Sequence, residues 1–367
     1  MKHVAFITGA RSEYSLARGL LRALKEDSDF ELTIIANGMH LLQTYGHTIT
    51  ELRNDAYGRI YEVPTYSELS NEKVADFTNT VSALSIVLRE ILPDIAFIIG
   101  DRIEAYGAAL AAHFVGIPIA HSGGGQITEG AIDNIYRYNI TNLSDLHLVT
   151  SKLSQQRLRA LPTVASDRVL FAGALNVDEI YSFRANPRGI DEFLDGVDSR
   201  PYALATFHPV TQGDEPIDSL LVRSVEVITS MGYNILLTYP NNDDGALPII
   251  ETILSIQNKP GVFVCESLGA EGYYAALNDC LFVIGNSSSG IREAPYFEKP
   301  IINVGNRQKG REKDVGIVDV PATAASICNA VTQGRSQGWP QPSCSNIYGN
   351  GTAVETCIEA IRIFLEH

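Results

Sequence analysis

Apolar segments of strand length alternate with longer amphipathic segments along most of the chain. The segments that we expect to form strands lie at residues 3–8, 31–36, 95–100, 118–121, 146–150 and 169–173, and then at residues 202–207, 234–239, 262–266, 280–285 and 301–304. Helical periodicity separates them, as at residues 14–25 and 71–91. Because strands that alternate with helices are typical of βαβ units, the pattern predicts an α/β fold with parallel sheets.

A polar stretch at residues 183–201, punctuated by Gly and Pro, divides this alternation into two halves. The chain has 367 residues, more than one hydrophobic core usually holds. We therefore expect two Rossmann-like, doubly wound domains, at residues 1–180 and 181–350, facing each other across a cleft. An amphipathic pattern at residues 352–365 predicts a helix, within a final segment at residues 351–367, that packs back on the first domain.

The composition and the net charge of the chain exclude several classes of binding partner and site. The net charge is −15, from 43 acidic and 28 basic residues, which disfavours a nucleic-acid surface or an anionic-membrane surface. The five cysteines show no CxxC spacing, so neither a disulfide framework nor a zinc site is predicted. No apolar run approaches the roughly 20 residues of a membrane span, and a strand-like segment begins too early for a signal peptide. A reducing cytoplasm fits these features.

Residues 285–295, which read GNSSSGIREAP, carry the strongest chemical signal. Small residues let backbone N–H groups approach a bound group, serine hydroxyls add donors, and a helix that begins here would point its positive end at the same place. A serine-rich helix cap without a ligand is the alternative. Three serines flanked by two glycines exceed what a cap requires, so we interpret the run as a phosphate-binding loop.

Two loops of the first half follow predicted strands. Residues 9–14 read GARSEY, which is neither GxGxxG nor a P-loop; Arg11 in this turn either holds a diphosphate or lies in solvent beside a capped helix. Residues 100–104 read GDRIE, where Asp101 either faces the ligand or caps the next helix, with Glu104 completing a capping box. The position of Asp101 at the carboxyl end of a strand favours a functional role.

A third loop contains three consecutive glycines before Gln126, a pattern that suggests that another group occupies the space of the missing side chains. Asp133 and Arg137 share a face of the following helix, either in the site or as a surface pair. In the second half, His208 follows a strand, where a neutral imidazole can bond a phosphate or a hydroxyl. Glu293, behind the serine run, suits sugar hydroxyls better than phosphate.

These segments, taken in order, resemble the UDP-N-acetylglucosamine 2-epimerase family, and most closely its hydrolysing branch. The blocks that carry the resemblance are GARSE at 9–13, GDRIE at 100–104, TEGAID at 128–133, TFHP at 206–209, YPN at 239–241, SLG at 267–269 and the serine run, so it covers nearly the whole chain. The resemblance implies a GT-B-like pair of Rossmann domains. The UDP-sugar-binding residues that it implies are Arg11, Glu104, Asn241, Ser267, Ser287, Ser288, Ser289, Gly290 and Glu293. The catalytic residues that it implies are Asp101, Gln126, Asp133, Arg137 and His208.

The implied chemistry is loss of UDP from C1 and of the proton from C2, which gives a 2-acetamidoglucal. Water then adds to yield free N-acetylmannosamine, or its diacetamido analogue, as needed for nonulosonic acids such as sialic and legionaminic acid. The enzyme has to stabilise the departing diphosphate and place proton-transfer groups beside C2. The resemblance implies no metal or other cofactor, and it implies a homo-oligomer, a dimer or a tetramer.

The sequence departs from this family at one place. Where relatives usually have His-Gly-Gly-Glu, this chain has Gly123 to Gln126, and where they have Arg-His it has Arg137 and Tyr138. Gln126 cannot transfer a proton as a glutamate does, although it can hydrogen-bond an N-acetyl group or a hydroxyl. The alternatives that remain open are an altered sugar substrate, a rearranged base, a catalytically altered nucleotide-sugar-binding homologue, or a glycosyltransferase on the same scaffold.

Overall fold

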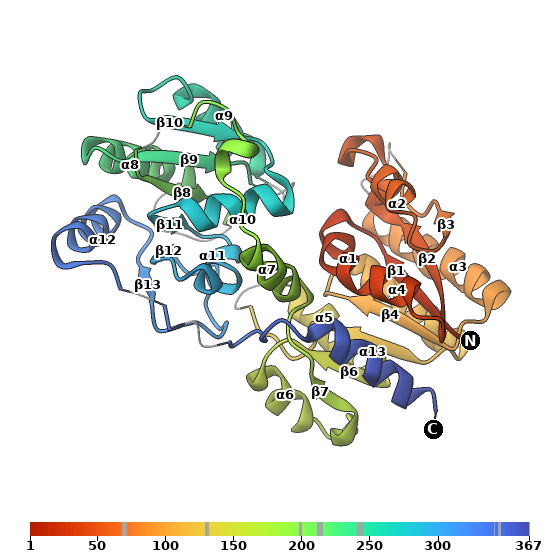
Figure 1. The fold of residues 1–367 in the computed structure, drawn as a ribbon. Helices are drawn as coiled ribbons and strands as arrows, with labels where there is room; N and C mark the ends of the chain where they lie inside the picture. Colours follow the sequence, from red (N-terminus) through yellow and green to blue (C-terminus); the bar gives the residue numbers. More distant parts are fainter. Residues whose placement is uncertain are drawn as a thin grey trace. The chain divides into compact units, whose positions relative to one another are not determined.

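The computed structural model describes residues 1–67, 72–128, 132–197, 200–210, 216–240, 245–340, 342–343 and 346–366. The chain forms two compact units. Unit 1 comprises Met1–Glu179 and Tyr348–His367, and unit 2 comprises Ile180–Ile347. Figure 1 shows the helices and strands of both units.

The sheet of unit 1 is parallel throughout, with seven strands in the described residues, in the order β3-β2-β1-β4-β5-β6-β7. Its strands are β1 (Lys2–Thr8), β2 (Phe30–Asn37), β3 (Arg59–Val63), β4 (Ile95–Ile99), β5 (Ile119–Ser122), β6 (Leu146–Val149) and β7 (Val169–Phe171). The central strand β4, with sequence IAFII, is buried along its whole length. Such a run is expected where helices cover both faces of a parallel sheet.

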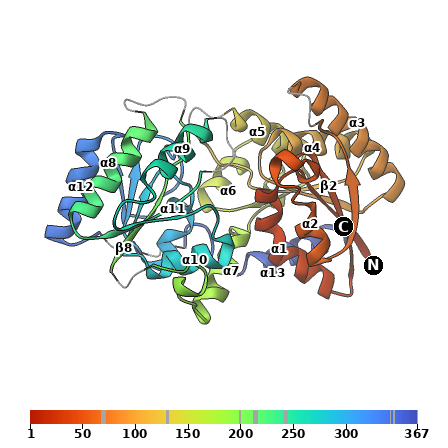
Figure 2. The same ribbon diagram turned by 90° about the horizontal axis from the view of Figure 1, so that it is seen from above.

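The helices of unit 1 form two layers on that sheet. They are α1 (Arg11–Glu26), α2 (Ile49–Asp55), α3 (Lys73–Ile91), α4 (Ile103–Val115), α5 (Asp133–Leu143), α6 (Lys152–Arg159) and α13 (Ala353–Phe364), while α7 (Leu175–Ala185) runs on into unit 2. Side chains of α1 and α13 share one hydrophobic core with the sheet, and those of α3 and α4 share another. Figure 2 shows α3 and α4 side by side.

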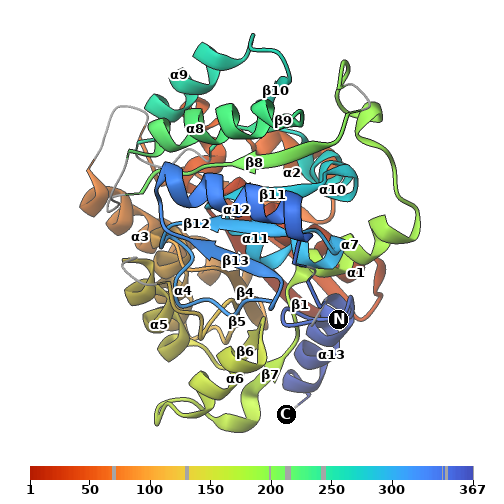
Figure 3. The same cartoon turned by 90° about the vertical axis from the view of Figure 1, so that its left-hand side faces the viewer.

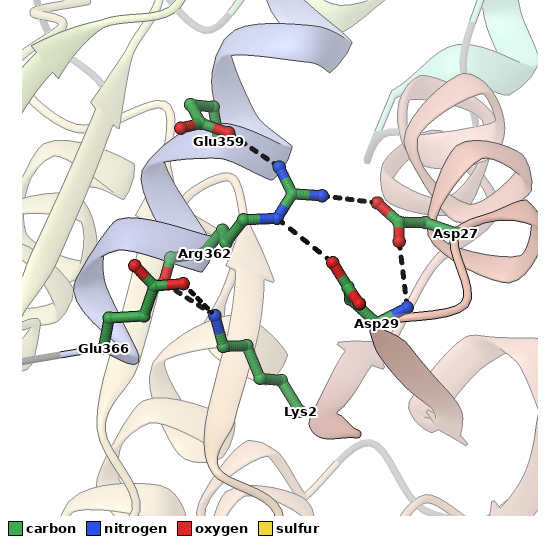
Figure 4. Close-up of polar contacts among 6 residues, drawn as sticks. All are labelled: Lys2, Asp27, Asp29, Glu359, Arg362 and Glu366. Carbon is green, nitrogen blue, oxygen red and sulfur yellow. Dashed lines mark hydrogen bonds and ion pairs between the residues drawn. The ribbon is translucent and has the colours of Figure 1, made fainter.

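The C-terminal helix α13 is held on unit 1 at both ends. At its start, the carboxylate of Asp178 accepts hydrogen bonds from the backbone N–H groups of Ala353 (2.9 Å) and Val354 (2.8 Å). Near its end, Arg362 contacts a cluster of carboxylates, and Lys2 pairs with Glu366 at 2.9 Å (Figure 4). The helix therefore belongs to the core of unit 1, although it follows the whole of unit 2 in the sequence.

Unit 2 repeats the architecture with six parallel strands in its described part, in the order β10-β9-β8-β11-β12-β13. They are β8 (Tyr202–Thr206), β9 (Asn234–Thr238), β10 (Val262–Cys265), β11 (Phe282–Gly285), β12 (Ile301–Val304) and β13 (Ile317–Val320). The helices are α8 (Ile217–Ser230), α9 (Ala246–Ile256), α10 (Gly269–Asp279), α11 (Ser289–Arg292) and α12 (Ala324–Gln337), with a 3-10 helix η5 (Ala294–Phe297). Helices α8 and α12 lie together over one face of the sheet (Figure 3).

Two strands that the sequence pattern did not predict, β3 and β13, both lie at an edge of their sheet. Their side chains are only partly buried, so their patterns lack the continuous apolar run of the central strands. Among the described residues, no helix combines the length and the hydropathy that a membrane span requires.

Candidate functional site

In unit 2, the ends of two neighbouring strands meet at a glycine. Gly285 ends β11 beside Thr206 of β8, and its φ is +140°. A Cβ at Gly285 would lie 2.0 Å from the carbonyl oxygen of Thr206, so only glycine fits. This close approach places the loop after β11 against the loop after β8, which carries His208.

Asn286 ties these two loops together. Its Oδ1 accepts a hydrogen bond from the backbone N–H of His208 at 2.6 Å, and its Nδ2 donates to the carbonyl oxygen of His208 at 2.9 Å. Its own carbonyl oxygen accepts from Gln308 Nε2 (2.9 Å) and Arg307 Nη1 (3.3 Å), both from the loop after β12. Asn286 lies inside the serine run that the sequence indicated, whereas no sequence signal pointed to Arg307 or Gln308.

The three serines that follow have different surroundings. Ser287 Oγ accepts from the backbone N–H of Ser289 (3.3 Å) and from its hydroxyl (3.0 Å), and it lies 3.3 Å from His208 Nε2. Ser289 Oγ also lies 2.5 Å from the hydroxyl of Tyr273, a residue of α10. Ser288 precedes α11, and within the described part of the chain no group bonds its hydroxyl. Ser288 is therefore the serine whose hydroxyl is available to a ligand.

The imidazole of His208 is neutral at physiological pH. Burial and, to a smaller extent, the positive charge of Arg307 together lower its pKa to about 3. A neutral imidazole can bond a hydroxyl or a phosphate, but it cannot act as a proton donor in the way that an imidazolium does.

Ser287 and Ser289 border a small hollow beside the serine loop, with room for about one water molecule. Its polar lining comes from Thr206, Tyr273, Ser287, Ser289 and Asn303. The helix behind the loop, α11, has only four residues before η5 begins, so it is shorter than the serine-to-helix pattern suggested. The loop offers hydroxyls and backbone N–H groups more than a long helix dipole.

The other predicted residues of unit 2 lie in various places. Gly290 is buried in α11, and Glu293 at the end of α11 is half-buried and close enough to Tyr273 for its charge to raise the pKa of that hydroxyl. Ser267 is exposed, and its hydroxyl accepts from the backbone N–H of Gly269 at 3.4 Å, which is a local turn contact. Asn241 lies outside the described residues.

In unit 1, Asp101 and Arg137 form an ion pair between the end of β4 and helix α5. Arg137 is buried, and it also donates to the carbonyl oxygen of Gln126 (2.8 Å) and to Asn134 Oδ1 (2.7 Å). The surface-pair interpretation of Arg137 is therefore wrong. The capping interpretation of Asp101 is wrong as well, because Arg102 is the residue that precedes α4 as its N-cap.

The glycine loop after β5 is shaped by close contacts rather than being a flexible linker. Gly123 (φ +104°) and Gly125 (φ +77°) have backbone conformations that favour glycine. A Cβ at Gly125 would lie 2.6 Å from the carbonyl oxygen of Ser154. Gln126 follows, and its Nε2 donates to Thr150 Oγ1 at 2.6 Å, so the amide is held at the end of β6.

A pair of buried carboxyl groups lies beneath the Gly9 turn. Glu13 accepts from the backbone N–H of Gly9 at 2.8 Å, and burial, with the nearby charge of Glu104, raises its pKa to about 7. Glu104 is buried too, and its Oε2 lies 3.5 Å from Arg102 Nε. Glu13 was not among the site residues predicted from the sequence. Because Glu13 occupies the Gly9 N–H, this donor is not available to a phosphate.

The remaining predicted residues of unit 1 are less enclosed. Arg11 begins α1, is 52% exposed, and its Nε pairs with Glu51 at 2.8 Å. Asp133 begins α5 and is half-buried. His121 is buried in β5, where its Nε2 contacts the carbonyl oxygen of Gly100 at 2.8 Å and burial lowers its pKa to about 4. In the described residues, no group of three His, Cys, Asp or Glu side chains is arranged to hold a metal ion.

Comparisons with known proteins connect these features to a family. The sequence model described as UDP-N-acetylglucosamine 2-epimerase matches residues 22–362. A Legionella pneumophila protein named UDP-N,N'-diacetylbacillosamine 2-epimerase (hydrolyzing) is 29% identical over 100% of this chain and 97% of its own length. A Campylobacter jejuni protein named GDP/UDP-N,N'-diacetylbacillosamine 2-epimerase (hydrolyzing) is 30% identical over 87% of this chain and 84% of its own length.

The fold agrees with solved structures. The structure of UDP-GlcNAc 2-epimerase from Neisseria meningitidis, bound to UDP-GlcNAc, has a TM-score of 0.82 and 18% identity, over 99% of this chain and 100% of that chain. At that identity the likeness concerns the fold, and it confirms the prediction of two Rossmann-like domains of the GT-B type. With the family model matching nearly the whole sequence, this chain belongs to the UDP-N-acetylglucosamine 2-epimerase family.

Proposed function

We propose that this protein is a hydrolysing 2-epimerase of nucleotide-linked N-acetylhexosamines. Its substrate is UDP-GlcNAc or a UDP-2,4-diacetamido-trideoxyhexose, and its products are UDP and the free 2-epimeric sugar, for nonulosonic acid biosynthesis. The observation that carries the proposal is the serine loop of unit 2, with Ser287 and Ser289 tied to His208 and the hydroxyl of Ser288 available. The names of two relatives, which both specify the hydrolysing reaction, support it.

Unit 2 is assigned the UDP group. Backbone N–H groups and hydroxyls of the serine loop stabilise the negative charge that develops on the departing diphosphate. Arg307 adds a positive charge beside the loop, since its Nη1 lies 3.3 Å from the carbonyl oxygen of Asn286. Glu293 is assigned to the ribose hydroxyls, because a carboxylate is unfavourable next to phosphate and favourable as an acceptor from hydroxyls.

We assign binding of the sugar and the proton transfers to unit 1. In the elimination, the C1–O bond breaks, UDP leaves with the electron pair, and a base removes the proton from C2. In the hydration, the hydroxyl of a water molecule adds to C1 and a proton adds to C2 on the other face. Asp101 is the assigned base, because its carboxylate is 29% exposed whereas its partner Arg137 is 3% exposed. Gln126, which cannot transfer a proton, is assigned to bind the N-acetyl group.

The test is to incubate the protein with each of the two UDP-sugars in deuterated water and to follow the products by NMR. The expected result is release of UDP together with a free 2-epimeric sugar that carries deuterium at C2. Epimerised UDP-sugar without release of UDP would indicate the non-hydrolysing reaction. Turnover only after an acceptor is added would indicate a glycosyltransferase, and binding without products would indicate a catalytically altered homologue; either result would overturn the proposal.

A further inference from the structure

Tyr273 of α10 joins the serine loop through its hydroxyl. The Tyr273 oxygen lies 2.5 Å from Ser289 Oγ, and Tyr273 lines the hollow beside the serine loop together with Thr206, at the end of β8. Thr206 Oγ1 lies 2.5 Å from Thr238 Oγ1, at the end of β9. Side chains from three elements of unit 2 thus meet at the serine loop.

The directions of the hydrogen bonds follow from counting donors. A hydroxyl has one proton and two acceptor lone pairs. Ser287 Oγ accepts from both the N–H and the hydroxyl of Ser289, so its own proton points to the remaining neighbour, His208 Nε2, at 3.3 Å. A neutral imidazole can accept this proton, which makes Nδ1 the protonated nitrogen of His208.

The same count fixes the next link. The proton of Ser289 is used on Ser287, so the short contact between Ser289 and Tyr273 requires the tyrosine to donate. Burial and the charge of Glu293 raise the pKa of Tyr273, so its hydroxyl keeps this proton at any physiological pH. The result is a directed chain, Tyr273 to Ser289 to Ser287 to His208, which we call the hydroxyl chain.

We infer that Tyr273 is a positioning residue for the serine loop: its hydroxyl orients Ser289 and, through Ser289, Ser287, so that the loop is already arranged to receive the diphosphate of the nucleotide. The inference rests on the proposed function, which places UDP at this loop. Tyr273 acts on the ligand through the serines and is not assigned a contact with it.

The physical reason is preorganisation. Each hydroxyl in a chain polarises the next, so the orientation of Ser287 depends on the first donor. Without the tyrosine hydroxyl, Ser289 loses its 2.5 Å partner and its rotation is no longer restricted. Binding of the diphosphate then has to order the two serines as well, and this cost appears as weaker affinity.

The experiment compares Tyr273→Phe with a matched control in the same unit. Tyr202 also has a buried hydroxyl, which donates to the carbonyl oxygen of Ala276 at 2.9 Å, away from the serine loop. Each substitution removes one hydroxyl and keeps the ring. The affinities of the full-length proteins for UDP and for uridine, which lacks the diphosphate, are measured by calorimetry.

We expect Tyr273→Phe to bind UDP about five- to tenfold more weakly than the unmodified protein, the size of one lost hydrogen bond. Uridine affinity stays the same, and Tyr202→Phe binds both ligands normally. A purely structural role of Tyr273 would weaken uridine and UDP together. Equal UDP affinity of Tyr273→Phe and the unmodified protein would overturn the inference while leaving the proposed function intact; failure of the unmodified protein to bind UDP would overturn both.

A double-mutant cycle tests whether Tyr273 acts through Ser289 in the hydroxyl chain. If Tyr273 acts through Ser289, Tyr273→Phe has no further effect on UDP affinity in a Ser289→Ala background. Two independent, additive losses would contradict the inference. If circular dichroism shows that Tyr273→Phe does not fold, Ser289→Ala alone interrupts the hydroxyl chain. Unchanged UDP affinity in Ser289→Ala would then contradict the inference.

Discussion

Arg362 on α13 donates a hydrogen bond to the carboxylate of Asp27 at 2.6 Å, across 335 positions of the chain (Figure 4). The same guanidinium lies 2.6 Å from Glu359 and 3.6 Å from Asp29. One cation therefore serves three carboxylates from α13 and from the segment that connects α1 to β2. Removing it would leave those negative charges facing one another.

We expect Arg362→Ala to lower the unfolding temperature of the protein. The substitution removes the hydrogen bond to Asp27 and also the positive charge that offsets the three neighbouring carboxylates. Arg223→Ala is the matched control, because Arg223 pairs with Glu226 at 2.7 Å in an exposed i,i+3 pair of α8. Exposed pairs of this kind contribute little, so the control should unfold as the unmodified protein does. Equal unfolding temperatures in all three proteins, measured by calorimetry, would contradict the assigned role of Arg362.

The conformation of Gly123 leads to a second prediction. A Cβ at this position would have room, with its nearest neighbour atoms in Gly100 at 3.6 Å, so a substitution meets backbone strain from φ +104° rather than a clash. Gly123→Ala should therefore lower the free energy of unfolding by about 1–2 kcal/mol.

Gly19→Ala should change the stability in the opposite direction to Gly123→Ala. Gly19 lies inside α1, and a Cβ there would be 3.4 Å from Val354. This substitution should raise the free energy of unfolding by roughly 0.5–1 kcal/mol, provided that the contact is accommodated. Urea denaturation measures both variants. A stabilising Gly123→Ala would show that the glycine loop has another conformation.

The third prediction concerns the pH dependence of stability. The pKa of Glu13 is raised from 4.5 to about 7, so between these values the folded protein binds a proton that the unfolded chain does not. Glu13 therefore contributes stability that is complete below pH 4.5 and is lost as the pH rises to about 7. Over this range the free energy of unfolding falls by at most about 1.4 kcal/mol per pH unit.

Glu13→Gln removes this titration and keeps an oxygen that can accept from the N–H of Gly9. The stability of the variant relative to the unmodified protein should rise with pH between 4.5 and 7 and stay constant above that. Arg102 and Glu104, which lie near Glu13, and the buried histidines are present in both proteins. Their contributions to the pH dependence therefore largely cancel when the stabilities of the two proteins are subtracted. A difference independent of pH, from denaturation at several pH values, would contradict the raised pKa of Glu13.

The fourth prediction separates chemistry from nucleotide binding. Asp101→Asn should lower kcat about 10²–10⁴-fold, the usual contribution of a general base, and leave UDP affinity unchanged. Ser288→Ala should weaken UDP binding, because its hydroxyl is assigned to the diphosphate. Steady-state kinetics with calorimetric UDP titration measures both effects. Weakened UDP binding in Asp101→Asn would contradict the division of roles between the two units.

The sequence predicted the fold well where apolar runs are continuous. The central strands β4 and β8 are buried along their length, and a run such as IAFII has few other interpretations. The edge strands β3 and β13 were missed because most of their side chains are exposed or only partly buried. The serine run was singled out because three serines flanked by two glycines exceed what a helix cap requires, and its phosphate-binding role stays a prediction.

Other site features depend on contacts that only the folded chain has. Tyr273 and Asn286 join the site through hydrogen bonds, 2.5 Å to Ser289 in one case and 2.6 Å to the N–H of His208 in the other. Glu13 gains its raised pKa from burial and from Glu104, which is far away in the sequence. A tyrosine on an amphipathic helix, or a glutamate in a helix's first turn, is otherwise an ordinary residue.

The return of α13 to unit 1 sets an order for folding during synthesis. Unit 2 is one continuous stretch, Ile180–Ile347, and all of it leaves the ribosome before α13 does. Unit 1 meanwhile has its sheet but lacks Cys357, Ala360 and Ile361, which complete one of its cores. The half of the protein that is translated first is therefore the half that finishes folding last, and a nascent chain that stalls before residue 353 exposes an uncovered apolar face to chaperones.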